Sequence, residues 1–261
     1  MNTGPGRVGA APVALVATTA EVLAHPELDE GLLAPWERHR LAGIREPARR
    51  DDVVAARLLL RLCASRVTGL PPRAVEPAQR CPGCGRDGHG RPYLPDHPGL
   101  GASFSHADGL AAAVVGPGPV GIDVEPLTRR PGPVPVLRRL LPHDEVDAAC
   151  AEPDPGPALL RLWVRREALF KAGRDDVPLT AWTDRRRAAV VALAGATGAT
   201  GATGAGATGA TGVGDRGAGA DGVTGAGRAD RDAGAAEPPV PPLSPGPAPS
   251  PPRVPAPPSG R

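Results

Sequence analysis

Lysine is almost missing from this sequence of 261 residues: of 30 basic residues only Lys171 is a lysine, and all the others are arginine. Against 28 acidic residues the formal net charge is +2, so bulk electrostatic attraction to nucleic acid is not indicated. Aromatic residues make up 2% of the chain, too few for the basic, aromatic face of a nucleic-acid-binding protein. No segment approaches the roughly 20 consecutive apolar residues of a membrane-spanning helix. We therefore expect neither nucleic acid nor membrane as a partner.

Cysteine is scarce as well. The four cysteines predict a reducing, cytoplasmic setting rather than a disulfide framework. Cys63 lies in an apolar helical pattern, which is typical of a small core residue. The N-terminal stretch GAAPVALVATTAE has some character of a signal peptide, but only Arg7 precedes it and Pro12 interrupts it. The letters VALVAT within it predict a first β-strand equally well.

Large apolar side chains are lacking in the C-terminal part of the chain. From Gly195 onward the sequence is a Gly/Ala/Thr tract, followed by EPPVPPLSPGPAPSPPRVPAPPSGR. Such segments bury too little apolar surface to offset the entropy lost on folding. A collagen-like repeat is the alternative, but the triplet period breaks at GAGATG and the prolines lie elsewhere. We predict a folded domain over residues 1–190 and a disordered tail over residues 195–261.

The folded part shows the periodicities of an α+β protein. Its helical segments begin near proline or aspartate and end just before glycine. Turn signals at Asp108-Gly109 and at residues 116–119 divide residues 101–125 into three short strands, and residues 81–99 have loop chemistry throughout. The predicted helices are one that begins near Pro35, then 51–69, 134–151 with a bend at Pro142, and 156–173; the other predicted strands are 13–19, 177–184 and 187–195.

Two acidic residues are separated by a single residue in VGIDVE, at the end of an apolar run. In a strand, Asp123 and Glu125 point to the same face because side chains alternate. Two carboxylates on one face suit Mg²⁺, a hard cation that keeps several waters for a phosphate substrate. A solvated strand end with two exposed acids is the alternative interpretation.

A second set of polar residues lies in RLWVRREALFKAG. Glu167 and Lys171 are four residues apart and therefore share one helical face. One interpretation is an ordinary surface ion pair between the two. In the other, Glu167 is a third carboxylate of the metal site, and Lys171 is a compact charge that reaches a phosphate. Ser105 and His106, in SFSHADG, end a predicted strand at a turn, where hydroxyl, imidazole and free backbone N–H groups can meet a phosphate. The sequence shows no acid or second base that would complete a hydrolase triad with this pair.

Four segments occur in one order along the chain: HGRPYL, FSHADG, VGIDVE and WVRREALFKAG. This ordered set resembles the 4′-phosphopantetheinyl transferases, specifically the larger monomeric type that primes carrier proteins for polyketide and non-ribosomal peptide synthesis. The strand motif (V/I)-G-(I/V)-D-(I/V)-E is matched at every position by residues 120–125. The helical motif W-x-x-K-E-(A/S)-x-x-K is matched except at its first lysine, which is Arg166 here.

The resemblance covers residues 35–184 and implies a fold of two pseudo-symmetric lobes, about 1–120 and 121–190. Each lobe would combine a helix with antiparallel strands. The family pattern continues with further strands, but this chain passes from LTAWTDRRRAAVVALAG directly into the low-complexity tail. Either the second lobe is truncated, or the tract is an altered reading of a once-folded segment.

The resemblance also implies a role for each matching residue. Three carboxylates would hold Mg²⁺ against the pyrophosphate of coenzyme A: Asp123, Glu125 and Glu167. Lys171 would contact that pyrophosphate. Further coenzyme A contacts are implied for Arg57, Arg91, Ser105 and His106, and more loosely for Arg38 and Arg40. Glu145 matches a glutamate proposed to assist proton removal, so the implied catalytic residues are Glu167, Lys171 and Glu145.

The implied reaction is the Mg²⁺-dependent transfer of the 4′-phosphopantetheine group from coenzyme A to a serine of an acyl or peptidyl carrier protein. The serine hydroxyl attacks the β-phosphorus and adenosine 3′,5′-bisphosphate leaves, while Mg²⁺ and Lys171 stabilise the developing charge. Glu167, Glu145 or a water on the metal would accept the serine proton, and the sequence does not distinguish them. A homologue that binds coenzyme A or a carrier protein without catalysis is an alternative.

The segment CPGCGRDGH supports a different alternative, a zinc-binding nucleic-acid module. Cys81, Cys84 and His89 have the spacing of structural zinc ligands. No fourth ligand is evident, and neither a second CxxC pair nor a basic aromatic face accompanies them.

Overall fold

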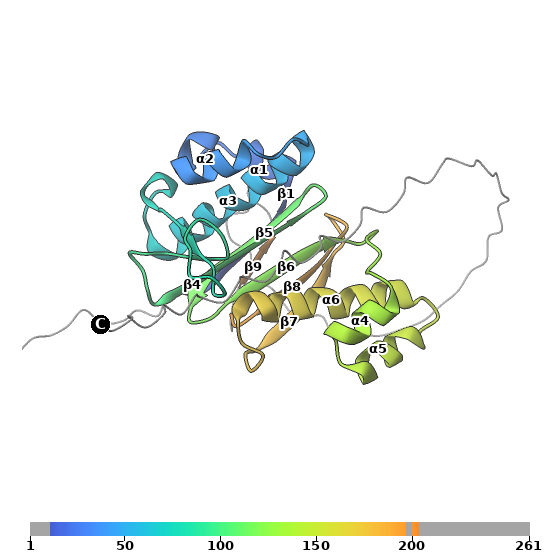
Figure 1. Cartoon of the computed structure of the whole chain (residues 1–261). Helices are drawn as coiled ribbons and strands as arrows, with labels where there is room; N and C mark the ends of the chain where they lie inside the picture. Colours follow the sequence, from blue (N-terminus) through green and yellow to red (C-terminus); the bar gives the residue numbers. More distant parts are fainter. Residues whose placement is uncertain (1–10, 197–199, 204–261) are drawn as a thin grey trace, which may run out of the picture. The chain divides into compact units, whose positions relative to one another are not determined.

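The computed structural model describes residues 11–196 and 200–203, where helices and strands occur in mixed order (Figure 1). The helices are α1 (Thr19–Leu23), α2 (Pro35–Leu41), α3 (Pro47–Thr68), α4 (Val134–Leu140), α5 (His143–Cys150) and α6 (Pro155–Ala172), with 3₁₀ turns η1 (Glu30–Leu32) and η2 (Pro72–Ala74). The strands are β1 (Val13–Thr18), β2 (Ala78–Arg80), β3 (Arg91–Tyr93), β4 (Leu100–Ala107), β5 (Leu110–Pro117), β6 (Gly121–Pro126), β7 (Leu179–Asp184), β8 (Ala189–Ala194) and β9 (Thr200–Thr203). The predicted α+β class is confirmed. Over the described residues, no helix has the length and apolarity to span a membrane.

The strands form two sheets of unequal size. The first has the order β2-β3-β4-β5-β1-β9 and the second the order β6-β8-β7. Neighbouring strands are antiparallel, except that β1 and β9 pair in parallel. The β4–β5 hairpin turns at Asp108 and Gly109, whose φ angles of 41° and 84° are those a two-residue hairpin turn needs. The chain passes from the first sheet to the second between β5 and β6 and returns to the first sheet with β9.

The two sheets pack face to face, and each carries one long helix on its outer face. Along β1, Leu15 belongs to the core beneath α3, whereas Val16 faces β6 and β8. Along β8, Val191 belongs to the core between the sheets, whereas Val190 packs against α6. Cys63 is fully buried in the α3 core, as predicted, and this burial raises the pKa of its thiol to about 12. The central strands are continuous apolar runs because both of their faces are covered.

The two long helices end in the same way. α3 is followed by Gly69 and α6 by Gly173, each at φ 74°, the left-handed conformation that closes a helix. α6 begins at Pro155, close to the predicted start. α3 begins at Pro47, four residues before the aspartates that were expected to mark its start, because proline fits the first turn of a helix. Asp52 therefore lies within α3 and not at its cap.

Three further segments differ from the sequence-based expectation. The predicted bent helix 134–151 is two helices, because Leu141 precedes Pro142 and adopts extended backbone (φ −123°, ψ 156°). Residues 81–99 are not loop throughout, since β3 lies among them and pairs with β2. β9 lies within the range 195–261 that was expected to be disordered; its pairing with β1 uses backbone groups and needs no large side chain. The remainder of that range, from residue 204 onward, lies outside the described residues.

Candidate active site

The predicted acids lie where β6 passes beneath α6. Ile122 points into the core between the sheets, so alternation puts Asp123 and Glu125 on the opposite face of β6, toward α6. Gly121 lies directly under the helix, since a Cβ atom there would meet the Ala168 carbonyl oxygen at 2.0 Å. Only glycine allows this approach, and it brings the last turns of α6 against the two acids.

A hydrogen-bonded triangle of side chains forms the centre of the site. Lys171 Nζ donates to Asp123 Oδ1 at 2.5 Å and to Ser105 Oγ at 2.9 Å. The Ser105 hydroxyl donates to the same Asp123 oxygen at 2.7 Å. Asp123 and Ser105 are buried, while the lysine side chain is 27% exposed. The single lysine of the chain therefore pairs with a buried aspartate at the edge of solvent, and not with Glu167 four residues before it.

The other two acids lie where their charge is disfavoured. Burial raises the pKa of Glu125 to about 7; the charge of Arg129 opposes this rise and that of Asp123 adds to it. Arg129 Nε lies 3.3 Å from Glu125 Oε2, although this oxygen accepts no hydrogen bond. Burial also raises the pKa of Glu167, the charge of Asp123 adds to the rise, and Lys171 opposes it. Both glutamates thus respond to the negative charge of Asp123.

Among the described residues, two buried carboxylate oxygens have no hydrogen-bond partner: Asp123 Oδ2 and Glu125 Oε2. A buried acceptor without a donor is costly, and oxygen ligands of this kind are those that Mg²⁺ prefers. The donor set therefore fits a divalent cation at Asp123 and Glu125. Glu167 does not join these two in a group whose ligand atoms all lie within 4.8 Å of one another, and Lys171 supplies the positive charge at Asp123.

Ser105 and His106 are neighbours on β4 but point to opposite faces. Both lie inside the strand, not at its end as predicted, and alternation separates their side chains. Ser105 faces Asp123 on β6, whereas His106 lines a cavity of about 760 Å³. Burial lowers the pKa of His106; the charge of Asp52 opposes this effect, and that of Lys171 adds to it. The two residues therefore do not meet one phosphate from the same side of the strand.

The cavity beside His106 is lined by more acidic than basic side chains: Glu46, Asp51, Asp52, Asp108 and Glu125 against two arginines. Arg49 from α3 and Arg129 from the segment after β6 line it, and Glu125 reaches it from the end of β6. Its volume lies in the range of ligand pockets, about 300–1,000 Å³. The cavity thus joins His106 to Glu125 across the end of the β4–β5 hairpin.

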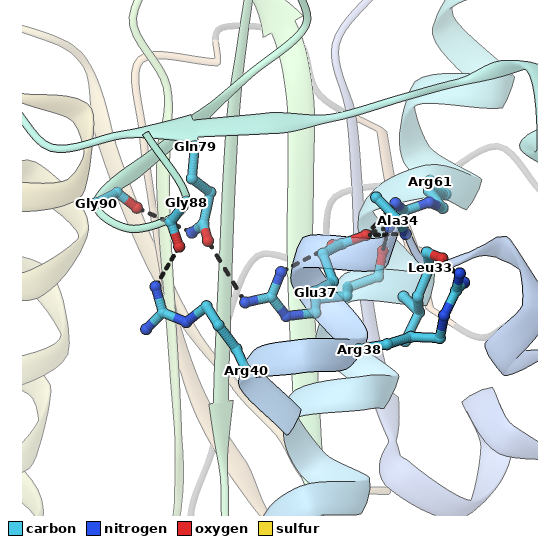
Figure 2. A network of polar contacts seen from close by, with 10 residues as sticks. Leu33, Ala34, Glu37, Arg38, Arg40, Arg61, Gln79, Gly88 and Gly90 are labelled. Atoms are coloured by element: carbon cyan, nitrogen blue, oxygen red, sulfur yellow. Dashed lines mark hydrogen bonds and ion pairs between the residues drawn. The ribbon is translucent and has the colours of Figure 1, made fainter. Parts of the chain in front are cut away.

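Arg57 is held inside the first lobe. Arg57 Nη1 lies 2.8 Å from Glu37 Oε1, its Nη2 donates to Gln79 Oε1 at 3.4 Å, and its guanidinium lies over the ring of Trp36. Figure 2 shows Glu37 between α2 and α3, where Arg61 binds its other carboxylate oxygen. Arg57 is only 5% exposed. These contacts form a buried ion cluster and do not present Arg57 to a phosphate, contrary to the role predicted for it.

The other predicted arginines bind main-chain groups. Arg91 on β3 donates to the carbonyl oxygen of Phe170 at 3.0 Å, one residue before Lys171, and so connects β3 to the last turn of α6. Arg38 and Arg40 donate to carbonyl groups of the chain before α2 and of the β2–β3 connection (Figure 2). Arg91 thus lies near the lysine, whereas Arg38 and Arg40 brace the first lobe.

Glu145 lies on a different side of α6. It belongs to α5, and its Oε2 atom is 4.0 Å from Arg165 Nη1. Together with Leu162 these residues line a cavity of about 590 Å³. Arg165 and Lys171 are six residues apart, which at about 100° per residue separates their side chains by roughly 120° around the helix. The structure does not bring Glu145 to Asp123, so its predicted part in proton removal has no geometric support.

Two residues that the sequence motifs do not single out shape the site. Arg129 is the ion-pair partner of Glu125, and the only sequence signal for it is a basic residue four positions after the acid. Asp52 accepts a hydrogen bond from the Thr19 hydroxyl at 2.5 Å and from the Gly109 backbone N–H at 3.1 Å. It therefore connects α1 and α3 to the β4–β5 turn, a set of contacts between distant segments that no local pattern indicates.

Comparison with known proteins agrees with this geometry. The 4′-phosphopantetheinyl transferase superfamily matches residues 119–198, which include β6, α6 and the predicted acids and lysine. Over 132 residues the chain is 27% identical to a 4′-phosphopantetheinyl transferase of Bacillus subtilis. The match covers 49% of this chain and 55% of that protein, so the chain spans about half the length of this relative. Through its second sheet and α6, the chain is similar to the 4′-phosphopantetheinyl transferase superfamily.

Proposed function

We propose that this chain transfers the 4′-phosphopantetheine group of coenzyme A to a serine of an acyl or peptidyl carrier protein and releases adenosine 3′,5′-bisphosphate. The match of residues 119–198 to the superfamily supports this type of reaction. The observation that carries the proposal is the pair of buried carboxylate oxygens of Asp123 and Glu125 that accept no hydrogen bond, beside the Lys171 ammonium. Transfer from a pyrophosphate uses this combination of cation ligands and fixed positive charge.

Asp123 and Glu125 would hold Mg²⁺. When bound, the cation would neutralise charge on the pyrophosphate. Lys171 contributes a charge that is already oriented, because Asp123 and Ser105 fix its ammonium by hydrogen bonds. A preorganised charge stabilises a developing negative charge more than a mobile one does. Ser105 is therefore a positioning residue that acts through Lys171 and Asp123.

The carrier serine must lose its proton as it attacks. Of the two glutamates considered, Glu167 is the better proton acceptor, because it lies on the face of α6 that carries Lys171. Burial and the nearby Asp123 raise its pKa, which brings the carboxylate closer to the range where a base is effective near neutral pH. Glu145 faces Arg165 on another side of the helix.

The carrier protein would approach the exposed end of α6. Phe170, directly before Lys171, is 63% exposed, and Leu140 on α4 is 51% exposed. Arg138 and Arg139 directly precede Leu140 on the same helix. Apolar side chains among arginines favour a partner with an acidic surface and an apolar centre.

The test is transfer to an apo carrier domain, followed by mass spectrometry of the carrier. We expect the purified full chain to add the phosphopantetheine mass when coenzyme A and Mg²⁺ are present. EDTA should abolish transfer, and Mg²⁺ or Mn²⁺ alone should restore it. Undiminished transfer in excess EDTA would contradict the metal-dependent mechanism.

Two variants of matched chemistry sharpen the test. Asp123→Asn keeps the shape of the side chain but removes its charge, and should lower the transfer rate by about 10²-fold or more. Asp96→Asn makes the same change at an exposed position and should transfer at the wild-type rate. If the wild-type chain binds coenzyme A in calorimetry but leaves the carrier unmodified at every metal concentration, it is a binding protein and not a transferase.

A further inference from the structure

Three potential metal ligands outside the proposed active site lie together in the β2–β3 connection. The ligand atoms of Cys81, Cys84 and His89 are all within 4.8 Å of one another. They are the only three His, Cys, Asp or Glu residues that meet this condition in residues 11–196 and 200–203. The proposed transfer reaction uses none of them.

The distances within this cluster suit a tetrahedral metal ion. Cys84 Sγ lies 3.2 Å from His89 Nε2. Zinc bond lengths of about 2.3 Å to sulfur and about 2.0 Å to nitrogen would put the two atoms roughly 3.5 Å apart. Both cysteines are free thiols. Formation of the site therefore needs only a small adjustment of these side chains.

The backbone of the connection is folded in the way that such a site requires. Gly85 N donates to the Cys81 carbonyl oxygen at 2.9 Å, and Cys81 N donates to the Arg86 carbonyl oxygen at 3.0 Å. Gly85 and Gly88 have φ angles of 70° and 84°, which glycine adopts without strain. These turns reverse the chain and return His89 to the cysteines.

The chemistry of the three ligands favours zinc. Two thiolates and an imidazole form a soft ligand set that selects zinc over the hard cation Mg²⁺. The ligands also lie at the surface, since Cys84 is exposed and the other two are half-buried, so an ion from solution reaches them.

The connection links the first lobe to the active-site helix. Gln79 Nε2 donates to the Gly90 carbonyl oxygen at 2.9 Å, and Arg40 donates to that of Gly88 (Figure 2). The next residue after Gly90 is Arg91, which binds the last turn of α6. A fixed connection would therefore hold Arg91 in place beside Lys171.

We propose that Cys81, Cys84 and His89 bind one Zn²⁺ ion, with water at the fourth position, and that this ion clamps the β2–β3 connection. The clamp stabilises the loop that carries Arg91 and takes no part in the transfer chemistry. Zinc is thus bound at a site separate from the carboxylates proposed for Mg²⁺, and the two proposals stand or fall independently.

The first experiment measures metal content in the reduced full chain. After incubation with Zn²⁺ and desalting, mass-spectrometric elemental analysis should find stoichiometric zinc in the wild type and in Cys150→Ser. Cys150 is a half-buried cysteine at the end of α5, so this variant controls for loss of a thiol. Cys84→Ser should retain about one tenth of the zinc or less, because the thiolate supplies much of the affinity. Absence of zinc in the wild type, or equal zinc in Cys84→Ser and Cys150→Ser, would overturn the proposal.

A second experiment identifies the ligands and tests the clamp even if Cys84→Ser does not fold. Co²⁺ in place of zinc should give a thiolate-to-cobalt charge-transfer band in the wild type and in Cys150→Ser. Trypsin cleavage after the exposed Arg86 should be faster in chelator-treated wild type and return to its original rate with Zn²⁺, but not with Mg²⁺. Cleavage that does not respond to zinc would show that the connection is not clamped by the metal.

Discussion

Two buried ionic clusters, one in each lobe, are built on opposite principles. In the first lobe, the Glu37 carboxylate accepts from Arg57 at 2.8 Å, from the Ala34 backbone N–H at 2.8 Å and from Arg61. Burial alone would raise the pKa of Glu37, but the hydrogen bonds and charge of Arg61 outweigh it and hold the pKa below its usual value. Every oxygen of this acid is used.

The acids on β6 are the reverse case. Asp123 and Glu125 each have a buried oxygen that accepts no hydrogen bond, and the pKa of Glu125 rises to about 7. In the first cluster two arginines surround one carboxylate, and the unpartnered buried atoms are the Nε atoms of Arg57 and Arg61. In the second, negative charge is in excess and the unpartnered atoms are acceptors. The saturated carboxylate supports the fold, whereas the unsaturated ones on β6 suit the cation that we propose there.

The largest effect we expect from this difference is on stability, at Glu37. Glu37→Gln leaves two buried guanidinium groups without their anion, and the free energy of unfolding should fall by about 3–5 kcal/mol at pH 7. Because the folded-state pKa of Glu37 lies below its ordinary value of 4.5, its stabilisation is complete above about pH 4.5. It is lost as the pH falls through the folded-state pKa, so the gap between variant and wild type should narrow in acid.

Urea unfolding followed by circular dichroism at neutral and acidic pH measures this gap. Glu76→Gln makes the same change at an exposed position and should alter the free energy of unfolding by less than about 0.5 kcal/mol. Equal stability of the two variants would mean that the Glu37 cluster does not support the fold, and the comparison of the two clusters would fail.

How far the sequence predicts each cluster also differs. The site on β6 and α6 is largely local: alternation puts Asp123 and Glu125 on one face, and a spacing of four residues puts Glu167 and Lys171 on one helix face. The glycines that close α3 and α6, and the Asp108-Gly109 turn, are equally local signals. These predictions needed no knowledge of the tertiary structure.

The remaining predictions depended on contacts between distant segments. The motif match for Arg57 could not indicate that Glu37, twenty residues away, and Gln79 would occupy its guanidinium. In the same way, the motif match for Glu145 could not indicate that this residue would face Arg165 instead of Asp123. β9 was not foreseen because its pairing with β1 uses backbone groups in a segment with little side-chain pattern.

The next largest effect concerns the rate of transfer, at Lys171. Lys171→Ala removes a charge that is fixed beside Asp123 and matters more as charge builds on the transferred phosphate. We expect a loss of about 10²–10³-fold in rate. The transfer rate is measured by mass spectrometry of the carrier in samples quenched at successive times. A rate equal to that of the wild type would mean that the lysine serves only to neutralise Asp123.

Lys171→Arg distinguishes a phosphate contact from a simple counterion. Arginine keeps the charge and can pair with Asp123, so folding and most coenzyme A binding should persist. The planar guanidinium is bulkier than an ammonium and directs its donors differently, so turnover should still fall. Wild-type turnover in Lys171→Arg, together with a loss in Lys171→Ala, would assign the residue to charge balance alone.

The smallest effect uses two serines on the same face of β4 that differ in what they contact. Ser105 bonds to Lys171 and Asp123, whereas the Ser103 hydroxyl accepts from the Ile122 backbone N–H at 3.2 Å. A hydrogen bond to a charged group contributes about 1.5–3 kcal/mol, so Ser105→Ala should reduce turnover by about tenfold as the ammonium loses part of its orientation. Ser103→Ala removes a neutral hydrogen bond of about 1 kcal/mol and should lower the thermal midpoint by a few degrees without changing turnover. Both variants should be compared in the same assay and the same melting experiment. If Ser103→Ala lowers turnover and Ser105→Ala does not, or if both variants lower only the thermal midpoint, then the function of the cluster on β6 does not depend on Ser105.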